Sequence, residues 1–261
     1  MGILTAGIYQ FDIMRGEVDA NIRRALTGIS RLSDQGADLA VLPEMFSSSF
    51  DYPALSDHAQ KTPEIIELLS KAAKAKSLAI AGSLPEADAG TIYNTLYVIG
   101  KDGDIAGKYR KAHLFSFIGE DKNFEAGTSA VVCKTGGRRF GLIICYDLRF
   151  PEICRTLALK GAEVIIVSAQ WPAPRIHHWD ILLRARAIEN QLFVVAANSY
   201  GQEGKLAYPG HSQIIAPQGE VLAMSASPDS ATTARLDLTE IQKFRNQFDC
   251  LSERAPLIYE L

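Results

Sequence analysis

Apolar residues recur along the chain in two periods that alternate from one end to the other. Short apolar runs typical of buried strands occupy residues 3–11, Leu39–Leu42 and Leu78–Leu84. Between them, Asn21–Asp34 and Pro63–Lys76 carry apolar or small residues at helical spacing, the second with a proline near its start. This alternation predicts an α/β fold.

The second half of the chain repeats the order of the first. Gln35–Leu42 and Lys160–Val167 each lead from a helix through a Gly-Ala-acid turn into an apolar strand. A hairpin predicted over Thr95–Lys108 has a counterpart in His211–Ser225, and each has an x-Gly dipeptide at its turn. A third echo pairs Ser77–Gly82 with Gln191–Ala196. Such echoes also arise by chance in α/β proteins, but three in the same order favour a duplicated β-α-β-α-β-β unit.

Each unit would form a sheet whose helices cover only one face. Packing the two bare faces together gives a helix–sheet–sheet–helix (αββα) sandwich of two mixed sheets, with helices on the outer faces. No Pro/Gly/Ser-rich linker interrupts the chain, so we expect a single domain over residues 1–261.

Composition and charge exclude several classes of protein. The chain has 261 residues, is 47% hydrophobic and carries a net charge of −3 without any Lys/Arg block, which argues against nucleic-acid and membrane-surface partners. Its apolar runs are shorter than the ~20 residues that a membrane span needs. The N-terminus lacks a basic leader with a cleavage site, so we expect a cytoplasmic protein.

The four cysteines form no C-x-x-C pair and have no His cluster beside them. We therefore expect no metal, no cofactor and no disulfide framework, and free thiols fit a reducing cytoplasm.

One cysteine stands at the end of an apolar strand, in the segment RFGLIICYDLRFPE. The strand is Phe140–Ile144, and the helix predicted over Phe150–Leu159 begins with Pro-Glu, a common start signal. Cys145 lies between them, at a turn like the nucleophile elbow, where helix amides would stabilise a thiolate. Because free cysteines are often buried, core filling is the alternative.

Two charged residues also follow predicted strands. Glu44 comes after the strand that Pro43 ends, and strand ends of α/β folds often carry sites. Flanked by Phe46, its carboxylate would be partly desolvated, with a pKa suited to a general base; alone, it would be a solvated charge. Lys111 would hold a thiolate or an oxyanion, unless it belongs to a solvated basic face.

Three separated motifs, P-E-M-F, Y-R-K-x-H-L-F and C-Y-D-L-R-F-P-E, resemble in order and spacing those of the nitrilase superfamily of carbon–nitrogen hydrolases. The resemblance runs from about Ile3 to Leu261. It implies a hydrolase with the αββα sandwich fold, usually a homodimer. Residues 240–261 would then form a C-terminal tail that packs on the domain or on the dimer partner.

The resemblance also implies roles for the matching residues. Glu44 matches the general base, Lys111 the catalytic lysine, Cys145 the nucleophile, and Glu120 a second glutamate near the lysine. The implied reaction is acyl transfer through a thioester, with Lys111 and the backbone amide of Tyr146 holding the oxyanion. Its partners are a small-molecule amide and water.

Local features favour one branch of the superfamily. Cys-Tyr-Asp-Leu-Arg is similar to ω-amidases and to deaminated-glutathione amidases, and Leu148 stands where N-carbamoyl amino acid hydrolases tend to carry arginine. The implied substrates are ω-amides of dicarboxylic acids, such as α-ketoglutaramate and succinamate. A nitrilase or another aliphatic amidase would use the same three side chains, and a binding module with incidental Glu, Lys and Cys is the alternative outside enzymes.

A diacid monoamide needs a cation for its free carboxylate. Arg175, in the loop after Trp171, is available, whereas we expect Arg149 to pair with a carboxylate and hold a loop. Trp171 and Phe46 would wall a small pocket, although a lone tryptophan often fills the core.

Overall fold

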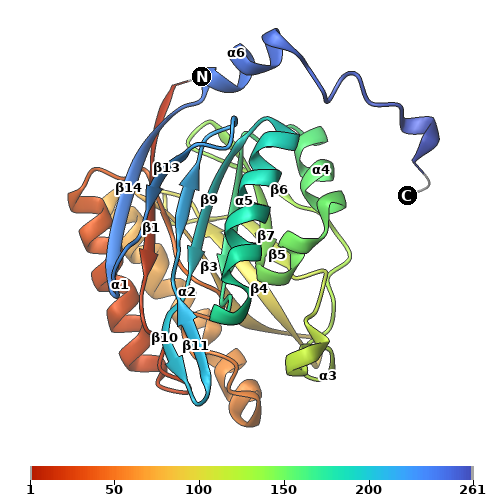
Figure 1. Cartoon of the computed structure of the whole chain (residues 1–261). Coiled ribbons are helices and arrows are strands. Elements are labelled where there is room, and N and C mark those ends of the chain that lie inside the picture. The colour runs from red at the N-terminus through yellow and green to blue at the C-terminus, as the bar shows by residue number, and fades with distance from the viewer. Residues whose placement is uncertain (1, 260–261) are drawn as a thin grey trace.

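The computed structural model describes residues 2–259, and two six-stranded sheets pack face to face at its centre (Figure 1). The first sheet has the spatial order β14 (Ser230–Asp237), β1 (Ile3–Gln10), β2 (Leu39–Val41), β3 (Ala79–Asp88), β4 (Thr91–Ile99), β5 (Ile105–Arg110). The second has the order β13 (Val221–Met224), β12 (Gln213–Ile215), β9 (Phe193–Asn198), β8 (Val164–Ala169), β7 (Arg138–Ile144), β6 (Val132–Thr135). Both sheets are mixed, as predicted.

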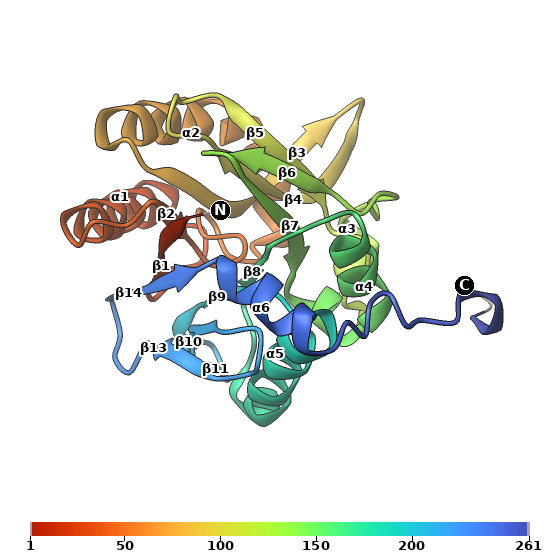
Figure 2. The same ribbon diagram turned by 90° about the horizontal axis from the view of Figure 1, so that it is seen from above.

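Helices cover the outer face of each sheet, as Figure 2 shows from above. α1 (Val18–Asp34) and α2 (Leu55–Lys76) lie on the first sheet, and α4 (Pro151–Leu159) and α5 (Ile176–Asn190) lie on the second. Inner-face residues of both sheets, among them Val41, Ala81, Leu142 and Ile166, share one buried cluster. The predicted αββα sandwich is confirmed.

The duplication is confirmed, with one addition that the sequence pattern did not reveal. In each half, three parallel strands with two helices between them are followed by a hairpin, β4–β5 or β12–β13. After each hairpin the chain crosses to the other sheet. β6 joins the second sheet beside β7, and β14 joins the first sheet beside β1, in register from Ile3 opposite Asp237 to Gln10 opposite Ser230.

The predicted start of α2 is wrong by eight residues. The helix begins at Leu55, and Pro63 lies inside it rather than in its first turn. Proline removes one backbone hydrogen bond from a helix interior. The helix is held nevertheless by its buried face, including Ala59 and Ile65, and by a hydrogen bond from the Thr62 hydroxyl to the Pro85 carbonyl.

The C-terminal segment begins on the domain and then leaves it. α6 (Thr239–Gln247) buries Ile241 and Phe244 against the body of the molecule. Beyond α6 the chain runs away from the sheets in both views (Figures 1 and 2), and Leu257 and Ile258 are 101% and 74% exposed. None of the helices within residues 2–259 is long and apolar enough to cross a bilayer.

Candidate active site

Glu44, Lys111 and Cys145 come together at one end of the sandwich, where they line a common pocket with Glu120. Each of the first three follows the carboxyl end of a strand: β2, β5 and β7. These ends converge because β2 lies against β8 across the sandwich. The Ser168 hydroxyl of β8 donates to the Leu42 carbonyl at 2.7 Å.

Cys145 has the backbone conformation expected at a nucleophile elbow. Its φ is 43°, in the left-handed region that residues other than glycine occupy only under strain. It opens a 3₁₀ turn over Cys145–Arg149, and α4 begins two residues later at Pro151. The turn therefore presents the thiol at the end of the sheet instead of continuing β7.

The buried carboxylate of Asp147 ties this turn to the segment that carries the lysine. It accepts hydrogen bonds from the Ile144 amide at 2.9 Å and the His113 amide at 3.0 Å. The Tyr109 hydroxyl donates to it at 2.8 Å. Tyr109 and His113 flank Lys111, so one side chain sets the spacing between the thiol and the ammonium.

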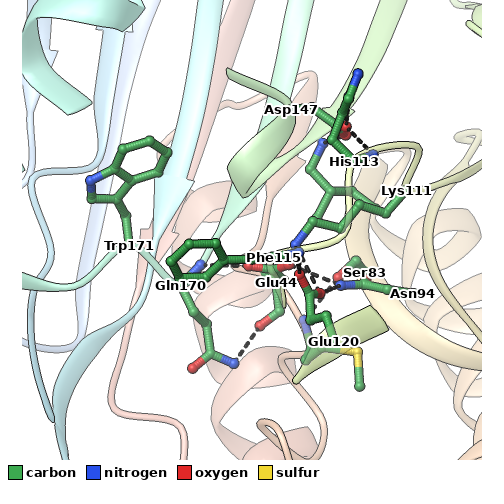
Figure 3. Close-up of polar contacts among 12 residues, drawn as sticks. Glu44, Ser83, Asn94, Lys111, His113, Phe115, Glu120, Asp147, Gln170 and Trp171 are labelled. Atoms are coloured by element: carbon green, nitrogen blue, oxygen red, sulfur yellow. Dashed lines mark hydrogen bonds and ion pairs between the residues drawn. The ribbon is translucent and has the colours of Figure 1, made fainter. Parts of the chain in front are cut away.

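Lys111 places its ammonium between two carboxylates (Figure 3). Its Nζ lies 2.8 Å from Glu44 Oε1 and 2.8 and 2.6 Å from the two oxygens of Glu120. The three side chains are at most 1% exposed. Glu120 also accepts the Phe115 amide at 2.7 Å, which anchors the loop after the lysine.

The two oxygens of Glu44 have different surroundings. Oε1 accepts from Lys111 and, at 2.8 Å, from the side-chain amide of Asn94. Oε2 accepts the backbone amide of Gln170 at 3.0 Å, and a side-chain hydrogen bond also joins the Glu44 carboxylate to Cys145. Gln170 also donates its side-chain amide to the Glu44 carbonyl, so the backbone of the glutamate is fixed as well.

Charge balance within this cluster keeps the thiol protonated. Burial and the Glu44 charge raise the pKa of Cys145 far above its usual value, although Lys111 opposes them. Burial also raises the pKa of Glu44, against the pull of Lys111. Burial lowers the pKa of Lys111, but Glu120 and Glu44 outweigh it and the pKa lies well above its usual value.

These effects favour a neutral thiol in the resting site over the thiolate that the turn alone led us to expect. One ammonium between two carboxylates leaves one net negative charge, and an ionised Cys145 would add a second in a dry site. The thiol must lose its proton during the reaction, and Glu44 is the adjacent group that can accept it.

Aromatic side chains and two arginines line the rest of the pocket, whose enclosed volume is about 30 Å³. The lining residues include Phe50, Phe115, Tyr146, Arg149, Trp171, Arg175 and Tyr208. Trp171 lines the pocket and also packs in the core. It is 2% exposed, and its indole N–H donates to the Arg175 carbonyl.

The prediction for Phe46 is wrong. Its ring packs in the core between the first sheet and its helices, against Gly82, where an added Cβ would lie 2.9 Å from the ring. The left-handed conformation of Met45 turns the chain directly after Glu44. Phe50, four residues further on, lines the pocket instead.

Neither pocket arginine pairs with a carboxylate in the part of the chain that the structure describes, which corrects the expectation for Arg149. The Arg149 guanidinium lies 4.7 Å from the Trp171 ring centroid and 3.4 Å from Nδ1 of His178. The Arg175 guanidinium lies over Phe115 and Phe117, at 5.6 and 5.1 Å. Both positive charges are available to an anionic ligand.

Besides the apolar wall residues, sequence reasoning missed three polar residues of the site. Asn94 lies on β4, Gln170 follows β8, and Tyr208 reaches the pocket from a hairpin formed by β10 (Tyr200–Glu203) and β11 (Leu206–Pro209). For Gln170 a signal existed, because it follows a strand just as Glu44 does. Asn94 and Tyr208 carry no such signal.

Comparison with known proteins gives a consistent result. The carbon-nitrogen hydrolase family pattern matches residues 5–246. The chain is 40% identical over 257 residues to the 2-oxoglutaramate amidase of Bacillus subtilis (strain 168), covering 98% of this chain and 99% of that protein. It is 35% identical over 255 residues to the omega-amidase NIT2 of Homo sapiens, covering 92% and 91%.

Solved structures agree in fold. A carbon-nitrogen hydrolase from Helicobacter pylori G27 matches with a TM-score of 0.94 at 26% identity, covering 99% of this chain and 97% of that one. A variant amidase from Nesterenkonia sp. AN1 matches with a TM-score of 0.88 at 25% identity, covering 98% and 95%. That amidase carries the acetamide moiety of fluoroacetamide covalently at its active-site cysteine.

Proposed function

The chain belongs to the carbon-nitrogen hydrolase family, and on that premise we propose that it hydrolyses the ω-amide of small dicarboxylic acid monoamides, such as α-ketoglutaramate or succinamate. The products are the diacid and ammonia. The observation that carries the proposal is a thiol beside a buried Glu–Lys pair, in a pocket whose wall holds two arginines without carboxylate partners among residues 2–259. The 40% identity to a 2-oxoglutaramate amidase supports the same substrate class.

The first step forms a carbon–sulfur bond. Oε2 of Glu44 takes the proton of the Cys145 thiol as the sulfur attacks the amide carbon. Oε2 is the suitable oxygen because Lys111 already occupies Oε1. The proton moves to a carboxylate whose pKa burial has raised, which makes Glu44 a stronger base than an exposed glutamate.

The carbonyl oxygen then becomes an oxyanion. Two donors are placed to hold it, the ammonium of Lys111 and the backbone amide of Tyr146. Tyr146 lies in the first turn of the 3₁₀ segment, where amides have no acceptor within the helix. Removal of one such donor slows an acyl-transfer enzyme by about a hundredfold or more.

Ammonia leaves when Glu44 returns the proton to the amide nitrogen and the carbon–nitrogen bond breaks. The remaining thioester is attacked by water, and Glu44 accepts a proton from that water. Cleavage of the carbon–sulfur bond then releases the diacid and restores the Cys145 thiol. Glu120 holds Lys111 in place.

The free carboxylate of the substrate is bound by a guanidinium in the pocket wall. Arg175 is our primary candidate, and Arg149 lines the same pocket with its charge equally uncompensated within the described chain. Trp171 lies between them as a wall. A neutral amide of the same length would lack this interaction and should bind less well.

We also propose a homodimer located in the cytoplasm. Ile181 and Ile188 on α5 are 63% and 47% exposed, so the outer face of this helix offers apolar surface to a second copy. Four free cysteines suit a reducing compartment. Light scattering coupled to gel filtration would give the mass, and a monomeric mass would end the dimer proposal.

The function is tested by ammonia release from a substrate panel. It should contain succinamate, glutaramate, α-ketoglutaramate, butyramide, a simple nitrile and an N-carbamoyl amino acid. We expect the three diacid monoamides to have the highest kcat/KM and butyramide to be much slower. Preference for the nitrile or the N-carbamoyl compound would overturn the proposal.

A further inference from the structure

Asn94 hydrogen-bonds to all three charged residues of the cluster, to the two carboxylates through its side chain and to Lys111 through the backbone alone. Its side-chain nitrogen donates to Glu44 Oε1 at 2.8 Å and to Glu120 Oε1 at 3.2 Å (Figure 3). Its backbone carbonyl accepts the amide of Lys111 at 2.9 Å. The side chain is fully buried on β4, next to the strand that leads into the lysine.

The orientation of this amide follows from its neighbours. The nitrogen of Asn94 faces two carboxylates, and a flipped side chain would turn its oxygen against both negative charges. The oxygen, in the orientation found, has no hydrogen-bond partner among the described residues. A buried acceptor without a partner costs stability, so packing alone does not explain an asparagine at this position.

We propose that Asn94 is a positioning residue, which holds Oε1 of Glu44 and favours the ionised carboxylate, so that Oε2 is left to exchange a proton with Cys145. This inference rests on the proposed function and names a further residue of its site. Donation to a carboxylate favours the charged form, so Asn94 opposes part of the burial effect on Glu44.

Other groups also bear on Glu44 and limit how its titration is interpreted. The titratable side chains that act on it, or that it acts on, are Lys111, Glu120, Cys145 and the phenols of Tyr52 and Tyr208. An apparent pKa measured for this site therefore belongs to the cluster as a whole. The effect of Asn94 is the change in that apparent pKa between the wild type and the Asn94 variants.

Two variants separate positioning from packing. In Asn94→Ala the carboxylates lose a donor, so kcat for succinamate should fall on the order of 10-fold or more, within the roughly 10²–10⁴-fold that general base catalysis supplies. KM should change little, and the acid limb of the pH profile should move to higher pH. In Asn94→Asp the new carboxyl group lies beside Glu44 and Glu120, and it can donate to them only while it is protonated. As pH rises and this new carboxyl group ionises, activity should be lost in a range where the wild type stays active.

Thr95→Val is the matched control. Thr95 is also fully buried on β4, and its hydroxyl donates to Glu86 at 2.7 Å, outside the cluster. This variant should lose thermal stability without moving the acid limb. If Asn94→Ala has the same acid limb as Thr95→Val and the wild type, Asn94 only packs and the inference is wrong.

Alkylation of Cys145 gives a readout that needs no substrate. Its rate with iodoacetamide, followed by peptide mass spectrometry across pH, should shift to higher pH in Asn94→Ala together with the acid limb. A shift in a protein that hydrolyses no amide would support the positioning role and refute the proposed function. Hydrolysis of succinamate with no shift in either profile would refute the positioning role alone.

Discussion

The ammonium of Lys111 lies 2.8 Å from Oε1 of Glu44, and these side chains are 1% and 0% exposed. Two charges at this depth depend on each other, because neither can be hydrated. Glu120, at 2.6 Å from the same ammonium, makes the site a triad with one excess negative charge. This excess governs both the stability of the site and the protonation of the thiol beside it.

Replacing the lysine should therefore destabilise the fold. In Lys111→Met two buried carboxylates lose their counter-charge, and breaking a buried pair in this way costs about 3–5 kcal/mol. The loss should be smaller at pH 5 than at pH 8, since protonation of the carboxylates relieves it. Urea denaturation at both pH values measures the free energy of unfolding.

The double variant Lys111→Met/Glu120→Gln controls for lost packing. It removes one of the two uncompensated charges and should recover part of the stability at pH 8, while hydrolysis stays abolished. If the single and double variants unfold at the same urea concentration, the triad does not behave as a charge unit.

Cys145→Ala should leave a folded protein with no measurable ammonia release. The backbone at this position is held by Asp147 through the Ile144 amide, so the turn does not depend on the sulfur. Circular dichroism and thermal unfolding would verify the fold. Cys250→Ala, at a half-exposed position in the C-terminal segment, should keep full activity. Normal turnover in Cys145→Ala would end the thioester mechanism.

The pH profile of kcat/KM should be broad, and both its acid limb and its alkaline limb should lie at higher pH than the ordinary pKa values of glutamate and cysteine predict. Glu44 must be ionised to act as a base, and burial raises its pKa above the ordinary value of 4.5, so activity is present above the raised value and lost as pH falls through it. On the alkaline side the Cys145 thiol stays protonated above pH 9.0, the ordinary pKa of a cysteine, because burial and the Glu44 charge raise its pKa. An alkaline limb near pH 7 would contradict a neutral resting thiol.

Arg175→Ala should weaken discrimination between charged and neutral amides. A hydrogen bond to a charged group contributes about 1.5–3 kcal/mol, so kcat/KM for succinamate should fall on the order of 10- to 100-fold. Hydrolysis of butyramide should change little. Arg149→Ala tested beside it shows which guanidinium binds the carboxylate, and unchanged succinamate hydrolysis in Arg175→Ala assigns that role elsewhere.

Local signals predicted most of what positions the charged residues. Pro43 ends β2 before Glu44, and the change from an apolar strand to a Pro-Glu helix start isolates Cys145. These signals depend only on neighbouring residues, which is why they can be read from the sequence. The family motifs then relate segments that lie far apart along the chain.

The features that the sequence did not predict share a physical cause. Whether a side chain is buried between the two sheets depends on segments far away along the chain, and neighbouring residues do not indicate it. Asn94 sits among Thr and Tyr in a hairpin, where a polar residue in a strand commonly faces water, yet it is fully buried. The protonation of Cys145 depends on how many carboxylates surround it. A helix dipole and one lysine favour a thiolate, but burial and the Glu44 charge outweigh them.

β14 was missed for a related reason. Its sequence, SATTARLD, contains no apolar run, because most of its residues are only partly buried at the edge of the sheet. Its pairing with β1 joins the last strand of the chain to the first, and nothing near Ser230 in the sequence indicates that partner.

This late pairing has a consequence for biogenesis. Until Ser230–Asp237 emerges from the ribosome, β1 is an open template for intermolecular pairing, although every strand that precedes Glu44 and Lys111 has long been translated. Nascent chains stalled before this segment should therefore bind holdase chaperones and resist release, and the protein should become protease-resistant in a single late event instead of half by half.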